Sequence, residues 1–340
     1  MTHKFRFFED YQVGESSAGV VDHPSRTINA SDIVSYGCIA GDYARVHLDR
    51  HHMADSIYGE RVAHGQFTAS LVAGMFSLSA PHIVGRGVPG AYFYGFSANY
   101  RDAVKVDDTI SLRWRVAEKA DAPAYEGFGL VNTAFEIINQ NEDCVCNGTV
   151  STLVRKESAR NTILQLKPIA PWQVEEYIPD PEKYYYAEDY PLGKGGETEG
   201  RTITEADIVN FAGLTGDYSP RYVDAEFAKS DIFGERVAHG MLVFSIARGS
   251  WGPHFDRYQR PKESFAGHLN DKATFLLPVK IGDTIRCQYK TAARRASQSR
   301  PEVRIITFEY QVLNQRNEVV QINSMLSMML SKEGLSNPNE

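Results

Sequence analysis

An aspartate and a histidine five positions apart are the residues of this chain whose types and spacing most favour chemistry. Asp42 follows Gly41, and His47 lies further along the same segment, GDYARVHLD. Imidazole has an ordinary pKa of about 6.5, so a neutral His47 can take a proton from water near neutral pH. Asp42 can orient that water and exchange its second proton. Because an α-helix has 3.6 residues per turn, a spacing of five does not place both side chains on one helix face, and we expect them in an irregular loop.

The chain repeats this segment 175 residues later without the histidine. GDYSPRYVD occupies 216–224, where Tyr222 stands at the position of His47, and GERVAHG at 59–65 recurs unchanged at 234–240. A constant offset over most of each half predicts a duplicated domain of ordinary size. A tyrosine, with a pKa of about 10, is a poor base at neutral pH. We therefore predict a catalytic first copy and a degenerate second copy that supports substrate binding.

The repeat defines the predicted domain organisation. Residues 1–156 form the N-terminal repeat, 157–186 a proline-rich linker, and 187–340 the C-terminal repeat. Proline removes a backbone donor and restricts its predecessor, so it opposes regular structure in the linker. The aromatic run 184–186 suggests that the linker packs on the domains.

Each half shows the same order of expected elements. Pairs at 29/32 and 204/207 have the spacing of a helix N-cap, and each predicted short helix ends near a glycine, at 41 or 216. A longer helix is expected from each Ala-His-Gly. Alternating residues at 109–116 and 304–312 predict strands, with hairpin turns at 139–143 and 314–318. We therefore expect an α+β fold in which a curved antiparallel sheet wraps round one enclosed apolar helix.

These motifs resemble the MaoC-like R-specific enoyl-CoA hydratases, which have the hotdog fold. The resemblance rests on Gly41-Asp42 with His47, then Asp49, and on Ala63-His64-Gly65 at a helix start. The family pattern Gly-Asp-x-Asn-Pro-x-His is broken at its Asn-Pro positions by Ala44 and Arg45. The second copy has Ser219-Pro220 there, closer to the family, but Tyr222 in place of the histidine.

The resemblance implies a double hotdog and a hydro-lyase that hydrates an enoyl-CoA thioester or dehydrates its product. Asp42 and His47 would be catalytic, and the amide of Gly65 would stabilise the thioester oxyanion from a helix N-terminus. No cofactor or metal is expected, since CoA is part of the substrate. His64 is a candidate substrate-binding residue, although its recurrence as His239 favours a structural role at the helix start.

At finer grain, the length and the Ala-Arg-Val-His variant are similar to mesaconyl-CoA hydratase (β-methylmalyl-CoA dehydratase). Mesaconyl-CoA carries a free carboxylate, and Arg45 in the catalytic loop could pair with it bidentately. The alternative is a surface arginine that pairs with Asp49 or Asp55. A simple short- or medium-chain R-specific hydratase is the second candidate.

Two other functions compete with hydration. A hotdog thioesterase usually uses an acid on the central helix, and residues 65–80 contain none, which argues against it. A non-catalytic acyl-CoA binding protein would explain Tyr222, but the presence of His47 with Asp42 disfavours it for the whole chain.

The composition of the chain limits the classes of partner and the cellular location that we expect. A net charge of −7 leaves no basic excess for nucleic acid. The four cysteines form no paired framework, which favours a reducing cytoplasm. Residues 62–85 carry no charge but many polar residues, so we expect a buried helix and not a membrane span. A homo-oligomer is expected by analogy.

Two further patterns are set aside. The histidines at 47, 51 and 52 could suggest a metal, but a third ligand and supporting contacts would be needed. Gly85-x-Gly87-x-x-Gly90 matches a dinucleotide fingerprint, yet it follows a predicted helix and precedes a strand, which is the reverse of the required order. We interpret it as a turn.

Overall fold

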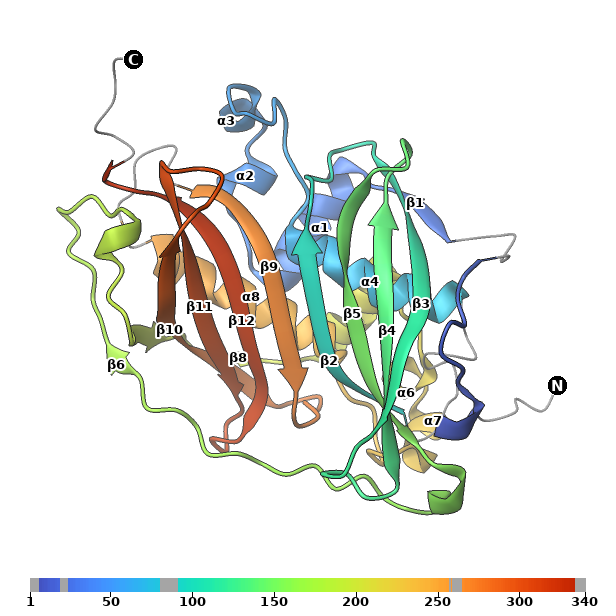
Figure 1. Cartoon of the computed structure of the whole chain (residues 1–340). Coiled ribbons are helices and arrows are strands. Elements are labelled where there is room, and N and C mark those ends of the chain that lie inside the picture. The colour runs from blue at the N-terminus through green and yellow to red at the C-terminus, as the bar shows by residue number, and fades with distance from the viewer. Residues whose placement is uncertain (1–5, 19–23, 80–90, 257, 259–264, 334–340) are drawn as a thin grey trace.

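One twelve-stranded sheet runs through the molecule, and two long helices lie against the same side of it (Figure 1). This computed structural model describes residues 6–18, 24–79, 91–256, 258 and 265–333. The strands of the first repeat follow the order β1 (Ser25–Thr27), β3 (Thr109–Asp121), β4 (Phe128–Ile138), β5 (Cys144–Arg155), β2 (Ala91–Tyr100). The sheet continues through β9 (Phe265–Phe275), β12 (Val319–Leu330), β11 (Val303–Leu313), β10 (Thr284–Ala296), β7 (Lys194–Glu197) and β6 (Glu175–Glu176), while β8 (Arg201–Thr202) pairs with β10. The expected α+β class is confirmed.

The helices begin and end where the local signals predicted. α1 (Ala30–Ala40) and α5 (Glu205–Thr215) each start with a capping box, and each ends at a glycine in the left-handed region, Gly41 (φ 82°) or Gly216 (φ 81°). Glycine adopts this conformation without the steric cost of a Cβ, so it turns the chain sharply into the next segment. The central helices α4 (Gly65–Ser79) and α8 (Gly240–Asp256) start at the two Ala-His-Gly motifs.

Shorter helices complete the chain. After α1 come α2 (Arg45–Leu48) and α3 (Arg50–Ala54), and the second repeat has α6 (Pro220–Val223) and α7 (Ala225–Ser230) at the matching places. Single 3₁₀ turns occur at η1 (Phe8–Asp10), η2 (Glu157–Ala159) and η3 (Ala187–Asp189).

Both central helices bury large apolar side chains, and for α4 the uncharged sequence predicted this. Phe67 and Phe76 of α4 are buried, and so are Phe244 and Trp251 of α8. Among the helices of the described residues, none is long and apolar enough to cross a membrane. The glycine pattern at 85–90 lies outside the described residues.

The two repeats meet like the subunits of a symmetric dimer. β2 pairs with β9 at the centre of the sheet, and the hydroxyls of the repeat mates Ser70 and Ser245 lie 3.3 Å apart. Arg201 donates to the carbonyl of Ile39 at 2.7 Å. Arg26 donates to the carbonyl of Leu214 in the reciprocal contact. In such an isologous contact each half presents the same surface to the other.

Small residues allow each central helix to approach the loop of the opposite repeat. A Cβ added at Gly74 of α4 would lie 1.8 Å from the carbonyl oxygen of Thr215, at the end of α5. A Cβ at Gly249 of α8 would lie 2.0 Å from the carbonyl oxygen of Ala40, at the end of α1. Each repeat therefore forms part of the wall around the other repeat's loop.

The predicted linker segment packs against the second repeat. The main-chain amide of Trp172 donates to Gln311 at 3.1 Å, and the Lys290 ammonium lies over the Trp172 ring. Within the tyrosine run Tyr185 is fully buried, whereas Tyr184 is exposed. The exact domain boundaries stay a prediction.

Candidate functional site

A left-handed glycine and a one-turn helix position Asp42 and His47. Gly41 ends α1, and the Asp42 carboxylate then accepts a hydrogen bond from the Ala44 amide at 3.2 Å. His47 lies on the short helix α2, whose first turn is closed by a bond from the His47 amide to the Ala44 carbonyl at 3.0 Å. The expectation of an irregular loop is therefore correct for Asp42 only. The extended conformation at Ala44 separates the two parts, so a spacing of five spans a bend plus one helical turn.

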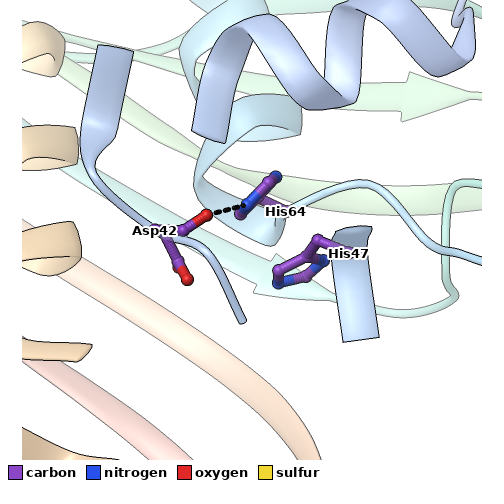
Figure 2. Close-up of side chains that lie close together, drawn as sticks. All are labelled: Asp42, His47 and His64. Carbon is purple, nitrogen blue, oxygen red and sulfur yellow. Dashed lines mark hydrogen bonds between the residues drawn. The ribbon is translucent and has the colours of Figure 1, made fainter. Parts of the chain in front are cut away.

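Asp42, His47 and His64 form one compact cluster (Figure 2). One ligating atom of each lies within 4.8 Å of those of the other two. The two imidazole rings stack with centroids 3.7 Å apart. A water makes hydrogen bonds of about 2.8 Å, so one water can bridge two groups at this separation. The predicted meeting of carboxylate and imidazole at a shared water is therefore geometrically possible.

Main-chain carbonyls fix the orientation of both rings. The Nδ1 atom of His47 lies 2.9 Å from the Val62 carbonyl oxygen, so Nδ1 carries the proton and donates. This leaves Nε2 of His47 as an acceptor, as a general base requires. The Nε2 atom of His64 likewise donates to the main-chain oxygen of Asp42 at 3.1 Å.

Burial and charge set the protonation states of the cluster. Desolvation by burial lowers the pKa of His47, although the Asp42 charge opposes this, so its imidazole is neutral at neutral pH. Burial and the neighbouring His47 lower the pKa of His64 to about 3. Burial raises the pKa of Asp42, but electrostatic interactions with His47, His64 and Arg248 and the hydrogen bond from the Ala44 amide outweigh burial and hold the pKa below its ordinary value. The site thus pairs a neutral base with an ionised carboxylate.

Gly65 is the first residue of α4, where the helix leaves free N–H groups and positive potential. An added Cβ would lie 3.0 Å from the ring of Tyr100, and its repeat mate Gly240 is crowded in the same way by Phe275. Glycine is therefore needed here for packing as well as for the predicted approach of a thioester. The helix start points to oxyanion stabilisation, and that role stays a prediction.

The contacts of the two residues predicted to bind substrate favour other roles. The side chain of Arg45 is 68% exposed and pairs with Asp49 at 2.9 Å, which supports the surface alternative. His64 is fully buried and holds the main chain of Asp42, and His239 makes the same bond to Asp217 at 2.9 Å. These contacts support a structural role at the helix start over contact with substrate.

A polar cluster beside the site was missed from the sequence. Asp271 is fully buried on β9 and accepts hydrogen bonds from Tyr100 at 2.7 Å and from Gln66 at 3.1 Å. His268 lies 3.1 Å from the other Asp271 oxygen and 3.0 Å from the Gln66 amide nitrogen. This Asp271 cluster joins β2 and β9 to the start of α4. Because its members come from both repeats and lie far apart in the sequence, no local motif predicts this cluster.

The second copy keeps the frame of the site and loses the base. Tyr222 stacks on His239 with centroids 3.8 Å apart, as His47 does on His64. Asp217 is buried and accepts a bond from the Ser219 hydroxyl at 2.6 Å. A pocket lies over this copy, with the following residues among its lining: Ala73, Phe93, Phe96, Asp217, Tyr222, Gly240 and Met241. Its walls are mainly apolar, and it is separate from the Asp42–His47 pair.

The same cluster could in principle hold a metal. Two histidines and a carboxylate are a common zinc ligand set, and among the described residues Asp42, His47 and His64 are the group with that geometry. However, His47 and His64 each already have one ring nitrogen bound to a carbonyl. His51 and His52, the other histidines of that stretch, do not belong to the group.

Comparison with known proteins supports the duplicated organisation. The family model described as MaoC like domain matches residues 14–127 and again 190–309. An (R)-specific enoyl-CoA hydratase of Rhodospirillum rubrum is 34% identical over 124 residues, 36% of this chain and 78% of that protein. Protein MaoC of Klebsiella aerogenes is 40% identical over 129 residues, 37% of each chain. The match with that protein thus spans little more than a third of each chain.

A solved structure shows the fold across the whole chain. A conserved hypothetical protein of Mycobacterium tuberculosis, described as having a double hotdog fold, aligns with a TM-score of 0.69 at 14% identity. The alignment covers 96% of this chain and 99% of that one. The predicted double hotdog is confirmed.

Proposed function

The chain belongs to the MaoC-like domain family, and on this premise we propose that it is a hydro-lyase that acts on an enoyl-CoA thioester. The observation that carries the proposal is the orientation of His47. Its Nδ1 is bound to the Val62 carbonyl, so Nε2 is the acceptor beside the ionised Asp42 carboxylate. Water addition needs such a base next to a group that holds the water.

The reaction follows from these groups. Asp42 and His47 hold one water, and Nε2 of His47 takes its proton as the oxygen adds to Cβ of the α,β-unsaturated thioester. The electron pair of the double bond moves through Cα to the thioester oxygen. The N–H of Gly65 at the start of α4 stabilises that negative charge. A proton returned to Cα by one of the two groups completes hydration, and the reverse sequence is dehydration.

Within this class we propose mesaconyl-CoA, hydrated to β-methylmalyl-CoA, as the substrate. The support is the similarity of the Ala44–His47 segment and of the chain length to mesaconyl-CoA hydratases. The carboxylate partner suggested by the sequence, Arg45, is paired with Asp49 on the surface and does not contribute to this proposal. Short- or medium-chain enoyl-CoA is the alternative substrate class.

One assay separates hydration from the competing functions. The enoyl-thioester absorbance and the concentration of free thiol are measured in the same reaction. The substrates are mesaconyl-CoA, crotonyl-CoA and a longer enoyl-CoA. Loss of absorbance without thiol supports hydration, whereas thiol release identifies a thioesterase. Tight binding with neither signal identifies an acyl-CoA binding protein.

Repeat mates provide a matched pair of variants for this assay. His47→Ala removes the base and is expected to lower kcat by about 10²–10⁴. Tyr222→Phe changes the corresponding position of the second copy and should leave kcat close to that of the native chain. Equal losses in the two variants would contradict the placement of catalysis in the first repeat.

The remaining expectations are independent of this assay. The absence of a cofactor, a cytoplasmic location and a homo-oligomeric state stay predictions. Light scattering of the purified chain measures the oligomeric state directly.

A further inference from the structure

Arg248 brings a positive charge from the second repeat to the first repeat's site. It lies on α8 beside Gly249, whose Cα packs so closely on the first repeat that a Cβ would lie 3.0 Å from the Asp42 amide nitrogen. Its charge acts on Asp42, His47 and His64, and it lowers the pKa of each of them. Arg248 is therefore close to the catalytic cluster, although it lies far from those residues in the sequence.

This guanidinium forms no ion pair with a described residue, although the Asp42 carboxylate is near enough for the two charges to interact. Its Nε atom is buried, and no described atom accepts a hydrogen bond from it. The group lies over the ring of Trp251, 4.7 Å from the centroid. Arg248 as a whole is half-buried, and a cation that is partly removed from water without an ion pair is unfavourable unless a ligand or another charge completes it. Asp271 is not that partner, since its contacts are with Tyr100, Gln66 and His268.

Comparison of the two copies shows that the first site is polar where the second is apolar. The repeat mate of Arg248 is Ala73, which lines the pocket over the second copy together with Asp217, Tyr222 and Gly240. By the two-fold relation of the repeats, Arg248 lines the first site together with Asp42, His47 and Gly65.

The same change occurs at the Asp271 cluster. Gln66, His268 and Asp271 correspond to Met241, Phe93 and Phe96, three residues that line the second pocket. Tyr100 corresponds to Phe275. The stacked rings of Phe93 and Phe275, 4.7 Å apart, copy the contact of His268 with Tyr100 at 4.9 Å. The backbone frame is therefore shared, while the chemistry of the wall differs at every one of these positions.

We propose that Arg248 recognises a carboxylate on the acyl group, so that the first site selects short enoyl thioesters of dicarboxylic acids. This inference rests on the proposed hydro-lyase function. A guanidinium pairs bidentately with a carboxylate. Because Ala73 and Gly240 line one pocket, the two-fold relation puts their mates Arg248 and Gly65 on one wall beside His47, and a thioester at Gly65 would place a short acyl chain next to Arg248. The phosphates of CoA are separated from that point by the pantetheine arm.

The test compares substrates that differ in the carboxylate. Arg248→Ala and Arg248→Lys are assayed with mesaconyl-CoA and crotonyl-CoA. Arg248→Ala is expected to lower kcat/KM for mesaconyl-CoA by at least about 30-fold, the usual consequence of truncating one partner of a desolvated charge pair. Turnover of crotonyl-CoA should change little. Arg248→Lys should recover part of the loss, because it restores the charge without the planar fork. Arg113→Ala, an exposed arginine on β3 that pairs with Glu142, is the matched control.

A binding measurement makes the result independent of catalysis. Calorimetry with the saturated thioesters methylsuccinyl-CoA and butyryl-CoA should show a preference for methylsuccinyl-CoA in the native chain and its loss in Arg248→Ala. Equal loss of turnover on both enoyl substrates would overturn the proposal, because Arg248 would then act through Asp42. Weaker binding of both saturated thioesters would assign Arg248 to CoA phosphate and overturn it as well. A native chain that hydrates neither substrate would refute the proposed function itself.

Discussion

Replacing Gly249 by alanine tests whether α8 sets the position of Asp42, the proposed catalytic aspartate. The new Cβ would lie 2.0 Å from the Ala40 carbonyl oxygen and 3.0 Å from the Asp42 amide nitrogen. Carbon and oxygen that are not bonded stay more than about 3 Å apart, so α8 and the loop must separate by about 1 Å. A displacement of this size at a catalytic group typically costs about 10²-fold in rate. We therefore expect kcat to fall by about 10² in Gly249→Ala.

Gly74→Ala is the control, because it makes the same collision at the second copy. There the Cβ would lie 1.8 Å from the Thr215 carbonyl oxygen, next to a loop without a base. Both variants should lose about 1–3 kcal/mol of unfolding free energy through overpacking, measured by urea denaturation. Steady-state hydration per folded molecule should fall about 10² in Gly249→Ala and far less in Gly74→Ala. Similar kcat values for the two variants would refute a positioning role for α8.

Three other predictions concern the protonation and identity of the site. Because burial lowers the pKa of His47, the acid limb of kcat/KM should lie below about pH 6.5, the ordinary value. The Asp42 charge raises that pKa, so residual activity in Asp42→Asn should show the limb at still lower pH, and a shift to higher pH would contradict the coupling. In a His47→Ala background, Tyr222→His should restore some hydration of crotonyl-CoA but not of mesaconyl-CoA, since Ala73 replaces Arg248 there and Arg221 is already paired with Asp231; a preference for mesaconyl-CoA would count against that assignment. Treatment with a chelator, checked by metal analysis, should leave the hydration activity unchanged. Loss of activity that is recovered on addition of zinc would show that the cluster of Asp42, His47 and His64 holds a metal.

The elements of the fold were predictable because their signals are local. A capping pair marks the start of α1 and of α5, and the left-handed glycines at 41 and 216 mark their ends. Alternation of apolar residues marks β3 and β11. Such local signals do not specify the order of the strands in the sheet, since the pairing of β2 with β9 joins residues far apart in the chain.

The proposed base stands out in the sequence because His47 breaks the repeat, whereas the polar residues around it were missed because the other positions of the two copies were not compared in the same way. His47 differs from its repeat mate Tyr222. Two further pairs of repeat mates differ in the same way, with Arg248 opposite Ala73 and His268 opposite Phe93. A systematic search for positions that are polar in one copy and apolar in the other would have identified them. Arg45 stays a weaker prediction, because Asp49 four residues later already pairs with it, which is the surface alternative that the sequence left open.

Joining the two hotdog units in one polypeptide has a consequence for how such a protein can specialise. In a dimer of identical subunits, every substitution would appear at both chambers at once, so a cation useful in one would intrude on the other. Here the glycines of α4 and α8 bring each repeat into contact with the loop that forms the other repeat's site. The two repeats are nevertheless encoded separately, so each can change without the other. The first site has thus been free to gain Arg248, His268 and Asp271, while the matching positions of the second pocket hold Ala73, Phe93 and Phe96. Neither repeat, expressed alone, would have a complete site, because the other repeat supplies part of the wall.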